Sequence, residues 1–395
     1  MNQSSIYICG LGAVSPAGWG VPALREALSK GEPLPLQSLD RPAGQKPVRA
    51  RLVPSPAARP GFLAHPRLRR TSPITHYSAA AAIEALATVP ALRGGKLRLG
   101  LVVSLQTGCV HYCSRFYDET LRDPATASPL LFPETVFAAP ASHVATLLEN
   151  VTLACTLVGD PTAFLSAVAL GVRWLEEKRV DASLIIGAEE THWILADALW
   201  HLEREAVLTG GAGALCLSCD PRFSVGVQLA AITDPHTYSA RLPRAQAARA
   251  MRGQLDGSSS DLLCDGLGGG RRANAPEAAA WNDWTGPRLS LKRVLGEGLM
   301  AAAAWQCVAA CDAVAGGRFA AANVSLVGGS QQAIGARFVR STARAVAAGV
   351  MPAVEGGILR PGAAPGSPSA TAMRNPIPPG RLPGFTAGRM PAATA

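Results

Sequence analysis

The stretch TLACTLVGDPTAFLSAVALGVRWLEEKRVDASLIIGAEE, from Thr152 to Glu190, shows the alternation that decides the fold. Residues 152–158 and 182–190 are short apolar runs, as expected of buried strands. Between them, apolar side chains recur at the spacing of a helix, at Phe164, Leu165, Val168, Val172 and Leu175. Strands that alternate with helices favour an α/β fold with buried sheets.

The same alternation extends along most of the chain. In the first half, we expect strands over residues 6–14, 97–105 and 210–219 and a helix from Ser78 to Val89. A similar succession starts near Val225, with strands over residues 225–233 and 323–329 and a helix over 291–315. We therefore predict two duplicated halves, residues 1–220 and 221–340. Residues 341–395 are rich in Pro, Gly and Ala and predict a disordered tail.

Composition narrows the class of protein. The chain has 395 residues, 48% of them hydrophobic, with nine cysteines. It shows neither an apolar run of about 18 residues nor an N-terminal signal, so we expect no membrane span and a cytoplasmic location. The spacings CVHYC (109–113) and CLSC (216–219) raise the alternative of a zinc site. Both lie in or beside apolar, strand-like runs, which favours core thiols, no metal and no cofactor.

Positive charge is concentrated in two regions. Residues 41–71 carry eight Lys or Arg side chains and no acid, and residues 341–395 carry five arginines and one glutamate. A basic surface attracts an anionic partner, although a solvated loop explains the same charges. No nucleic-acid motif accompanies the arginines, so we expect no nucleic-acid partner.

Four segments together resemble the β-ketoacyl synthase family. They are IYICGLGAVSPAGWG (6–20), SPLLFPETVFAAPASHVA (128–145), EEKRVDASLIIGAEE (176–190) and NVSLVGG (323–329). The resemblance covers about residues 5–340. It implies a thiolase-like, five-layered αβαβα core, usually dimeric.

The resemblance also locates where the family's nucleophilic cysteine would stand. Counting 28 residues back from Glu189, or 18 forward from His143, arrives at Pro161. Asp160 is a preferred helix N-cap and Pro161 suits the first helical position, so this place reads as a helix start without a thiol. Cys155, in LACT, falls six residues earlier within a predicted strand. We interpret Cys155 as an inert core thiol.

The family's two catalytic histidines are missing as well. By resemblance their places fall on Gly266 and Glu297, and no histidine follows His236. The family's lysine and glutamate match Lys292 and Glu277, while Gln306 stands where the lysine's glutamate partner would be. We interpret Lys292 and Glu277 as structural residues. The alternative is that Glu297 and Asp160 form a replacement acid–base pair.

These losses resemble a chain-length factor, the non-catalytic subunit that pairs with an active ketosynthase in polyketide, fatty-acid-like or aryl-polyene pathways. Such a subunit has no autonomous activity and helps to wall the acyl tunnel. Two alternatives stay open: a homodimeric acyl-binding or scaffold protein of the same fold, and a diverged copy without function. The tunnel-lining candidates are Phe132, Thr135, Phe137 and Val327, and the candidates for binding an acyl carrier protein are Arg67, Arg69 and Arg70.

Overall fold

The computed structural model describes residues 5–42, 45–89, 91, 97–239, 242–268, 270–330 and 332–341. The predicted tail therefore lies, from residue 342 onward, outside the described residues. None of the described helices is both long enough and apolar enough to cross a membrane.

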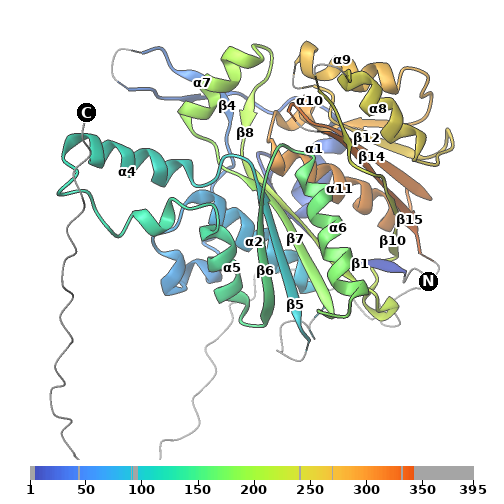
Figure 1. Cartoon of the computed structure of the whole chain (residues 1–395), viewed down its shortest axis with the longest axis horizontal. Coiled ribbons are helices and arrows are strands. Elements are labelled where there is room, and N and C mark those ends of the chain that lie inside the picture. Colours follow the sequence, from blue (N-terminus) through green and yellow to red (C-terminus); the bar gives the residue numbers. More distant parts are fainter. Residues whose placement is uncertain are drawn as a thin grey trace, which may run out of the picture. The chain divides into compact units, whose positions relative to one another are not determined.

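The principal strands form two groups of five with the same topology (Figure 1). In spatial order, the first group is β6 (Val151–Val158), β5 (Leu99–Leu105), β7 (Ala182–Glu189), β9 (Gly211–Ser218) and β1 (Ile6–Ser15). The second is β13 (Arg288–Ser290), β12 (Leu262–Asp265), β14 (Ala321–Val327), β15 (Gln332–Arg340) and β10 (Val227–Ile232). Numbered along the chain, each group has the order 3-2-4-5-1, with the fifth strand antiparallel to both neighbours. This repetition confirms the predicted duplication, whereas the boundary at residue 220 stays a prediction.

Helices complete five layers. Between the sheets lie α6 (Ala163–Glu176), against β5 and β7, and α11 (Met300–Ala315), against β7, β9 and β14. The outer face of the first sheet is covered by α2 (Pro73–Ala87) and α5 (Ala139–Leu148), and that of the second by α8 (Arg244–Gly253) and α9 (Arg271–Ala280). The predicted thiolase-like αβαβα fold is confirmed. Ile6–Ile8 of β1 pair with Val227–Leu229 of β10 and join the two halves.

The central layer depends on small side chains. Every residue of α11 except the last is buried, and alanine is the commonest residue among them. A Cβ on Gly213 of β9 or Gly187 of β7 would lie 2.7 or 2.8 Å from the Cβ of Ala304. Glycines on the strands and alanines on the helix therefore set how closely α11 approaches the sheet. The indole of Trp305 donates to the carbonyls of Val14 and Ala212, at 3.1 and 3.0 Å.

Two local predictions are wrong. The helix expected over 291–315 is divided into α10 (Leu291–Leu295) and α11, because Gly296 and Leu299 adopt positive φ angles of 95° and 48°. The CVHYC segment does not belong to a strand: Cys109 immediately precedes α4 (Val110–Arg122), which contains His111 and Cys113.

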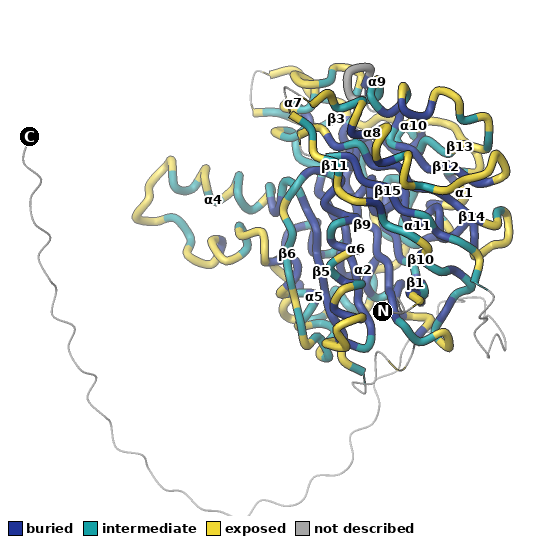
Figure 2. The backbone as a smooth tube through the Cα atoms, turned by 45° about the vertical axis from the view of Figure 1, so that its right-hand side comes forward, coloured by how far each residue is buried: buried dark blue, intermediate teal, exposed yellow. Residues whose placement is uncertain are grey.

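The α4 segment projects away from the sheets, and its helix has no buried residue (Figure 2). The remaining elements are short or peripheral. They are β2 (Gly18–Trp19), α1 (Val21–Lys30), β3 (Gln37–Leu39), β4 (Val48–Arg51), η1 (Gly61–Ala64), η2 (Pro66–Leu68), η3 (Phe132–Glu134), α7 (Trp193–Leu202), β8 (Leu208–Thr209), η4 (Pro221–Phe223) and β11 (His236–Thr237).

Candidate functional site

The turn between β6 and α6 is organised by Asp160. Its carboxylate is buried and accepts hydrogen bonds from the Thr162 N–H at 3.1 Å and from the Thr162 hydroxyl. The other oxygen accepts from the Ser330 N–H at 3.1 Å and from its hydroxyl at 3.4 Å. Since Ser330 follows β14, this carboxylate connects the helix start of the first half to a loop of the second.

The helix starts slightly later than expected. Thr162, rather than Asp160, occupies the N-cap position of α6, and its own side chain makes no cap hydrogen bond. The predicted role of Asp160 as N-cap is therefore wrong in position, although its carboxylate still binds an N–H group at the helix start. Pro161 lies between Asp160 and the cap, so the side chain at the expected place of the nucleophile is a pyrrolidine ring.

The loop after β14 lies directly against the carboxylate. A Cβ on Gly328 would stand 2.1 Å from Oδ2 of Asp160, so only glycine fits at this position. Residues 328–330 thus approach the start of α6. Neither Gly328 nor Ser330 was singled out from the sequence, because nothing local shows that they meet Asp160.

Cys155 lies on β6, opposite Val102 of β5, and not at a helix start. It is half-buried and packs against the main apolar core. A strand position lacks the aligned backbone dipoles that stabilise a thiolate at a helix N-terminus. Its interpretation as an inert thiol stays a prediction.

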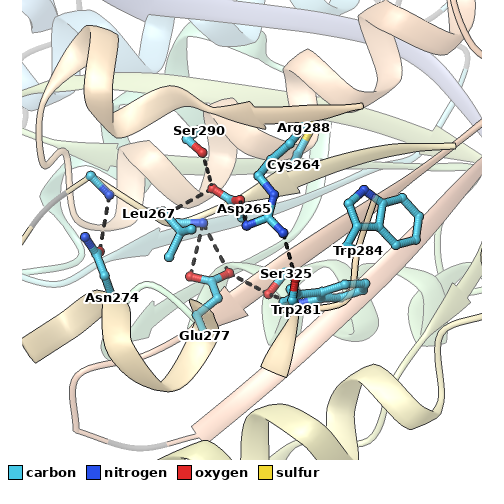
Figure 3. A network of polar contacts seen from close by, with 12 residues as sticks. Cys264, Asp265, Leu267, Asn274, Glu277, Trp281, Trp284, Arg288, Ser290 and Ser325 are labelled. Carbon is cyan, nitrogen blue, oxygen red and sulfur yellow. Dashed lines mark hydrogen bonds and ion pairs between the residues drawn. The ribbon is translucent and has the colours of Figure 1, made fainter. Parts of the chain in front are cut away.

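In the second half, Glu277 of α9 is the centre of a buried polar network (Figure 3). Both of its carboxylate oxygens lie 3.2 Å from the Gly266 N–H, and the Ser325 hydroxyl donates to Oε1. The indole N–H of Trp281 donates to the Ser325 oxygen at 3.1 Å. Burial, followed by repulsion from Asp265, raises the pKa of Glu277 to about 7. Gly266 is close to this group, since a Cβ there would stand 3.0 Å from Oε2 of Glu277.

Lys292 has a partner that the sequence did not reveal. Its Nζ lies 2.7 Å from Oε2 of Glu297, and Oε1 accepts from the Leu299 N–H at 2.9 Å. Gln306, at the place of the expected glutamate, instead donates to the carbonyl of Ser325 at 3.1 Å. Glu297 therefore neutralises Lys292 and fixes the break between α10 and α11. Asp160 and Glu297 are each held by their own donors, which leaves the replacement acid–base pair without support from this geometry.

Asp265 is a buried acid that sequence reasoning missed. It ends β12, accepts from the Ser290 hydroxyl at 2.6 Å and the Leu267 N–H at 3.1 Å, and pairs with Arg288 at 3.3 Å (Figure 3). Burial raises its pKa. The available signal was an acidic residue at the carboxyl end of a predicted strand, which is a common place for polar groups in α/β proteins.

Two adjacent glutamates at the end of β7 hold loops of the first half. Glu189 accepts from the Gln106 and Thr107 N–H groups, at 2.5 and 3.2 Å, and burial raises its pKa to about 7. Glu190 accepts from the N–H groups of Ile74 and His111, at 3.2 and 2.7 Å, near the starts of α2 and α4. Glu189 therefore holds the loop that leads to α4, and Glu190 fixes the starts of α2 and α4. Neither role was predicted.

The tunnel-lining candidates fall in two places. Phe132 and Phe137 are exposed and Thr135 is half-exposed, all three on the segment between α4 and α5. Phe132 contacts Phe116 of α4, with ring centroids 5.7 Å apart. Val327 packs with the cluster around α8, in the second half. The three basic candidates lie at or just after η2, and all are exposed: Arg67, Arg69 and Arg70.

Several solved structures share this architecture, and the names of two of them include both a ketosynthase and a chain length factor. The ishigamide ketosynthase/chain length factor aligns with 86% of this chain and 100% of its own, with a TM-score of 0.73 and 17% identity. The chain has the ketosynthase fold. A β-ketoacyl synthase from Burkholderia phymatum STM815 aligns with a TM-score of 0.72 and 15% identity, and covers 86% of this chain and 100% of its own.

A third structure holds ketosynthase ApeO in complex with its chain length factor ApeC, from Xenorhabdus doucetiae. It gives a TM-score of 0.69 at 15% identity and covers 86% of this chain and 98% of that one. No family model matches the chain, and no curated protein matches its sequence. The resemblance to β-ketoacyl synthases is therefore confirmed at the level of the fold.

The site contains no arrangement typical of a metal centre. Across the described part of the chain, no three or more His, Cys, Asp or Glu side chains are grouped so as to bind an ion. Cys109 and Cys216 are both buried and belong to the apolar cluster on the outer side of the first sheet.

Proposed function

We propose that this chain is a non-catalytic ketosynthase-like subunit of the chain-length-factor type, which pairs with an active ketosynthase and shapes its acyl tunnel. The observation that carries the proposal is the turn before α6, where Pro161 replaces the thiol and the Asp160 carboxylate binds Thr162 and Ser330. Covalent acyl transfer needs a nucleophile with a base or a depressed pKa. A proline ring supplies neither.

The second half supports the same proposal. Carbonyl polarisation during condensation requires donors aimed at the developing charge. At the two positions matched to the family's histidines, Gly266 has no side chain and the Glu297 carboxylate is neutralised by Lys292. The retained Glu277 is occupied by Gly266 and Ser325 and acts as a structural group.

Exposed apolar side chains support association with another subunit. Strand β6 is the edge strand of the first sheet, and the side chain of Val158 at its end is 51% exposed. An unpaired strand edge can bind another chain. Helix α4 and the segment between α4 and α5 expose further apolar side chains, at Tyr117, Leu121, Leu130, Phe132, Val136 and Phe137. We call this set, together with Val158, the arm surface. Exposed apolar patches of this kind are typical of interaction sites.

The tunnel assignment follows from this surface. Phe132, Thr135 and Phe137 belong to the segment that projects from the sheets, so they would meet the partner on assembly. Val327 lies one residue before Gly328, which approaches the Asp160 carboxylate. These four residues stay proposals for the wall of the tunnel.

The pairing is tested by co-expression with a ketosynthase that has an intact cysteine and both histidines. We expect the two chains to co-purify, and the synthase to give a different product length, or to be insoluble, without this chain. Val158→Lys should weaken co-purification, because it places an amine in the interface. Leu36→Lys, at a similarly exposed apolar position away from the arm surface, is the matched control. A synthase that folds and elongates equally well alone would contradict the proposal.

Carrier binding is a separate part of the proposal. A carrier protein with an acidic surface would be attracted to the exposed Arg67, Arg69 and Arg70. Charge reversal of all three to Glu should weaken carrier binding at low salt and leave assembly with the synthase unchanged. Unchanged carrier affinity would assign docking to the active subunit alone.

A further inference from the structure

A cavity of about 200 Å³ lies between α1, the second sheet and the C-terminal part of α11. Its walls are mostly apolar. They include Leu24, Leu28, Leu262, Val308, Ala309 and Phe319. Figure 2 shows α1 beside β12 and β13 in this region. Concave, mostly apolar sites with a few polar groups are typical of small-molecule binding.

The polar side of the cavity carries an excess of positive charge. Asp312 of α11 is bound by Arg25 of α1, with N–O distances of 2.6 and 2.9 Å, and by Arg318, at 3.0 Å. Two guanidinium groups thus share one carboxylate. The side chains of Arg25 and Arg318 remain about half exposed, at 50% and 49%, whereas that of Asp312 is 9% exposed. The arginines therefore face solvent, and the acid lies beneath them.

The third arginine of the cavity, Arg288, binds other groups of the protein. Arg288 pairs with Asp265 at 3.3 Å and donates to the carbonyl of Trp281 at 2.8 Å. The excess charge consequently belongs to the pair Arg25 and Arg318. Guanidinium donors are arranged in a planar fork that matches a carboxylate or a phosphate, so a second anion can bind them beside Asp312.

The size of the cavity limits the ligand. An apolar cavity of about 150 Å³ is large enough for benzene, so this one has room for roughly six to eight carbon atoms. We propose that this cavity binds a small amphipathic anion, with a short apolar tail between α1 and α11 and its anionic head on Arg25 and Arg318. The ligand class is a short linear carboxylate or alkyl phosphate. This site does not depend on the proposed pairing with a ketosynthase.

Isothermal titration calorimetry of the full chain tests the site with hexanoate, hexyl phosphate and hexan-1-ol. The neutral alcohol has the same tail and no charge. We expect at least one anion to bind about tenfold or more tightly than the alcohol, with the difference decreasing at high salt. The preferred anion then identifies the head group. Equal affinity for alcohol and anions, or no binding tighter than about 10 mM, would overturn the proposal.

Two variants test the location. Arg318→Gln removes a surface guanidinium and should weaken anion binding about tenfold, whereas Arg222→Gln, which removes an exposed arginine paired with Asp220, should have no effect. Ala309→Phe should abolish binding by filling the cavity, with Ala230→Phe at an exposed position as its control. If Ala309→Phe fails to fold, Arg318→Gln and the comparison of head groups still show whether the anion binds at this cavity. Binding that survives both cavity variants would place the ligand elsewhere.

Discussion

At the scale of single residues, two buried carboxylates lie beside positions at which the resemblance expects a thiol, Pro161, and an imidazole, Gly266. Asp160 receives hydrogen bonds from Thr162 and Ser330, and Glu277 receives them from Gly266 and Ser325. Such groups cost free energy when they are buried and recover it only through their partners. Their retention is explained by structure, since each one connects segments that are distant in the chain.

Removal of the Asp160 carboxylate should destabilise the protein. Asp160→Ala leaves the N–H groups of Thr162 and Ser330 without this acceptor, which should lower the free energy of unfolding by about 1–3 kcal/mol. Urea unfolding measures the change. Asp234→Ala removes an exposed carboxylate that binds Gln254 and should cost less than about 0.5 kcal/mol. Equal effects would show that the Asp160 network is not important for stability.

The raised pKa of Glu277 predicts that the free energy of unfolding falls as the pH rises. Burial raises its pKa from 4.5 to about 7 in the folded protein, so between these values the folded state holds a proton that the unfolded state has lost. The stability from this proton is fully present below pH 4.5 and is lost as the pH rises through 7. In Glu277→Gln, the free energy of unfolding should therefore fall less steeply over this window, by about 1.4 kcal/mol per pH unit.

Urea unfolding from pH 5 to 8 tests this difference. Glu189, whose pKa is also raised to about 7, contributes equally to both proteins and does not affect the comparison. Glu26→Gln, at an exposed position on α1, is the control and should keep the wild-type slope in this window. Parallel curves for Glu277→Gln and the wild type would contradict the buried, protonated glutamate.

The sequence predicts single residues unevenly. Pro161, Gly266 and Glu297 could be assigned because they lie at fixed distances from recognisable motifs. The partners of these residues could not, because Ser330 is 170 residues from Asp160 and no local pattern reports that contact. Glu297 was expected in a continuous helix, whereas the positive φ angles of Gly296 and Leu299 place it in a break.

At the scale of elements, the contact between α11 and the first sheet depends on small residues. Gly213→Ala should be destabilising, since its Cβ would stand 2.7 Å from that of Ala304, and overpacking of a core typically costs about 1–3 kcal/mol. Ala304→Gly removes the opposing methyl group, so the double variant should regain part of the loss. Thermal unfolding of both variants measures this. Additive losses would show that the two residues do not determine the spacing.

Regular elements were the easiest part to predict. The strand expected over residues 6–14 is observed as Ile6–Ser15, and the helix expected after Pro161 is α6. In contrast, α4 was not predicted: apolar side chains recur at helical spacing in VHYCSRFYDETLR, but the helix buries none of its residues. The exposure of the arm surface likewise depends on where this helix projects.

At the scale of the whole molecule, the two halves have the same strand order. By resemblance, each half lacks a different part of the family's catalytic centre. The first half lacks the thiol, and the second lacks the imidazoles. The fold does not require either group, because the core is made by α6 and α11 between the sheets. The architecture could therefore be predicted from alternating elements, whereas the proposed pairing with another subunit depends on a surface that no sequence pattern defines.

Covalent acylation tests the absence of a catalytic centre most directly. The purified chain is incubated with acyl and malonyl thioesters and examined by intact-protein mass spectrometry, with an active ketosynthase as positive control. We expect no acyl adduct on this chain, since Pro161 cannot accept an acyl group and Cys155 lies on a strand. An acyl adduct that maps to Cys155, or to any side chain near Asp160, would contradict a non-catalytic subunit.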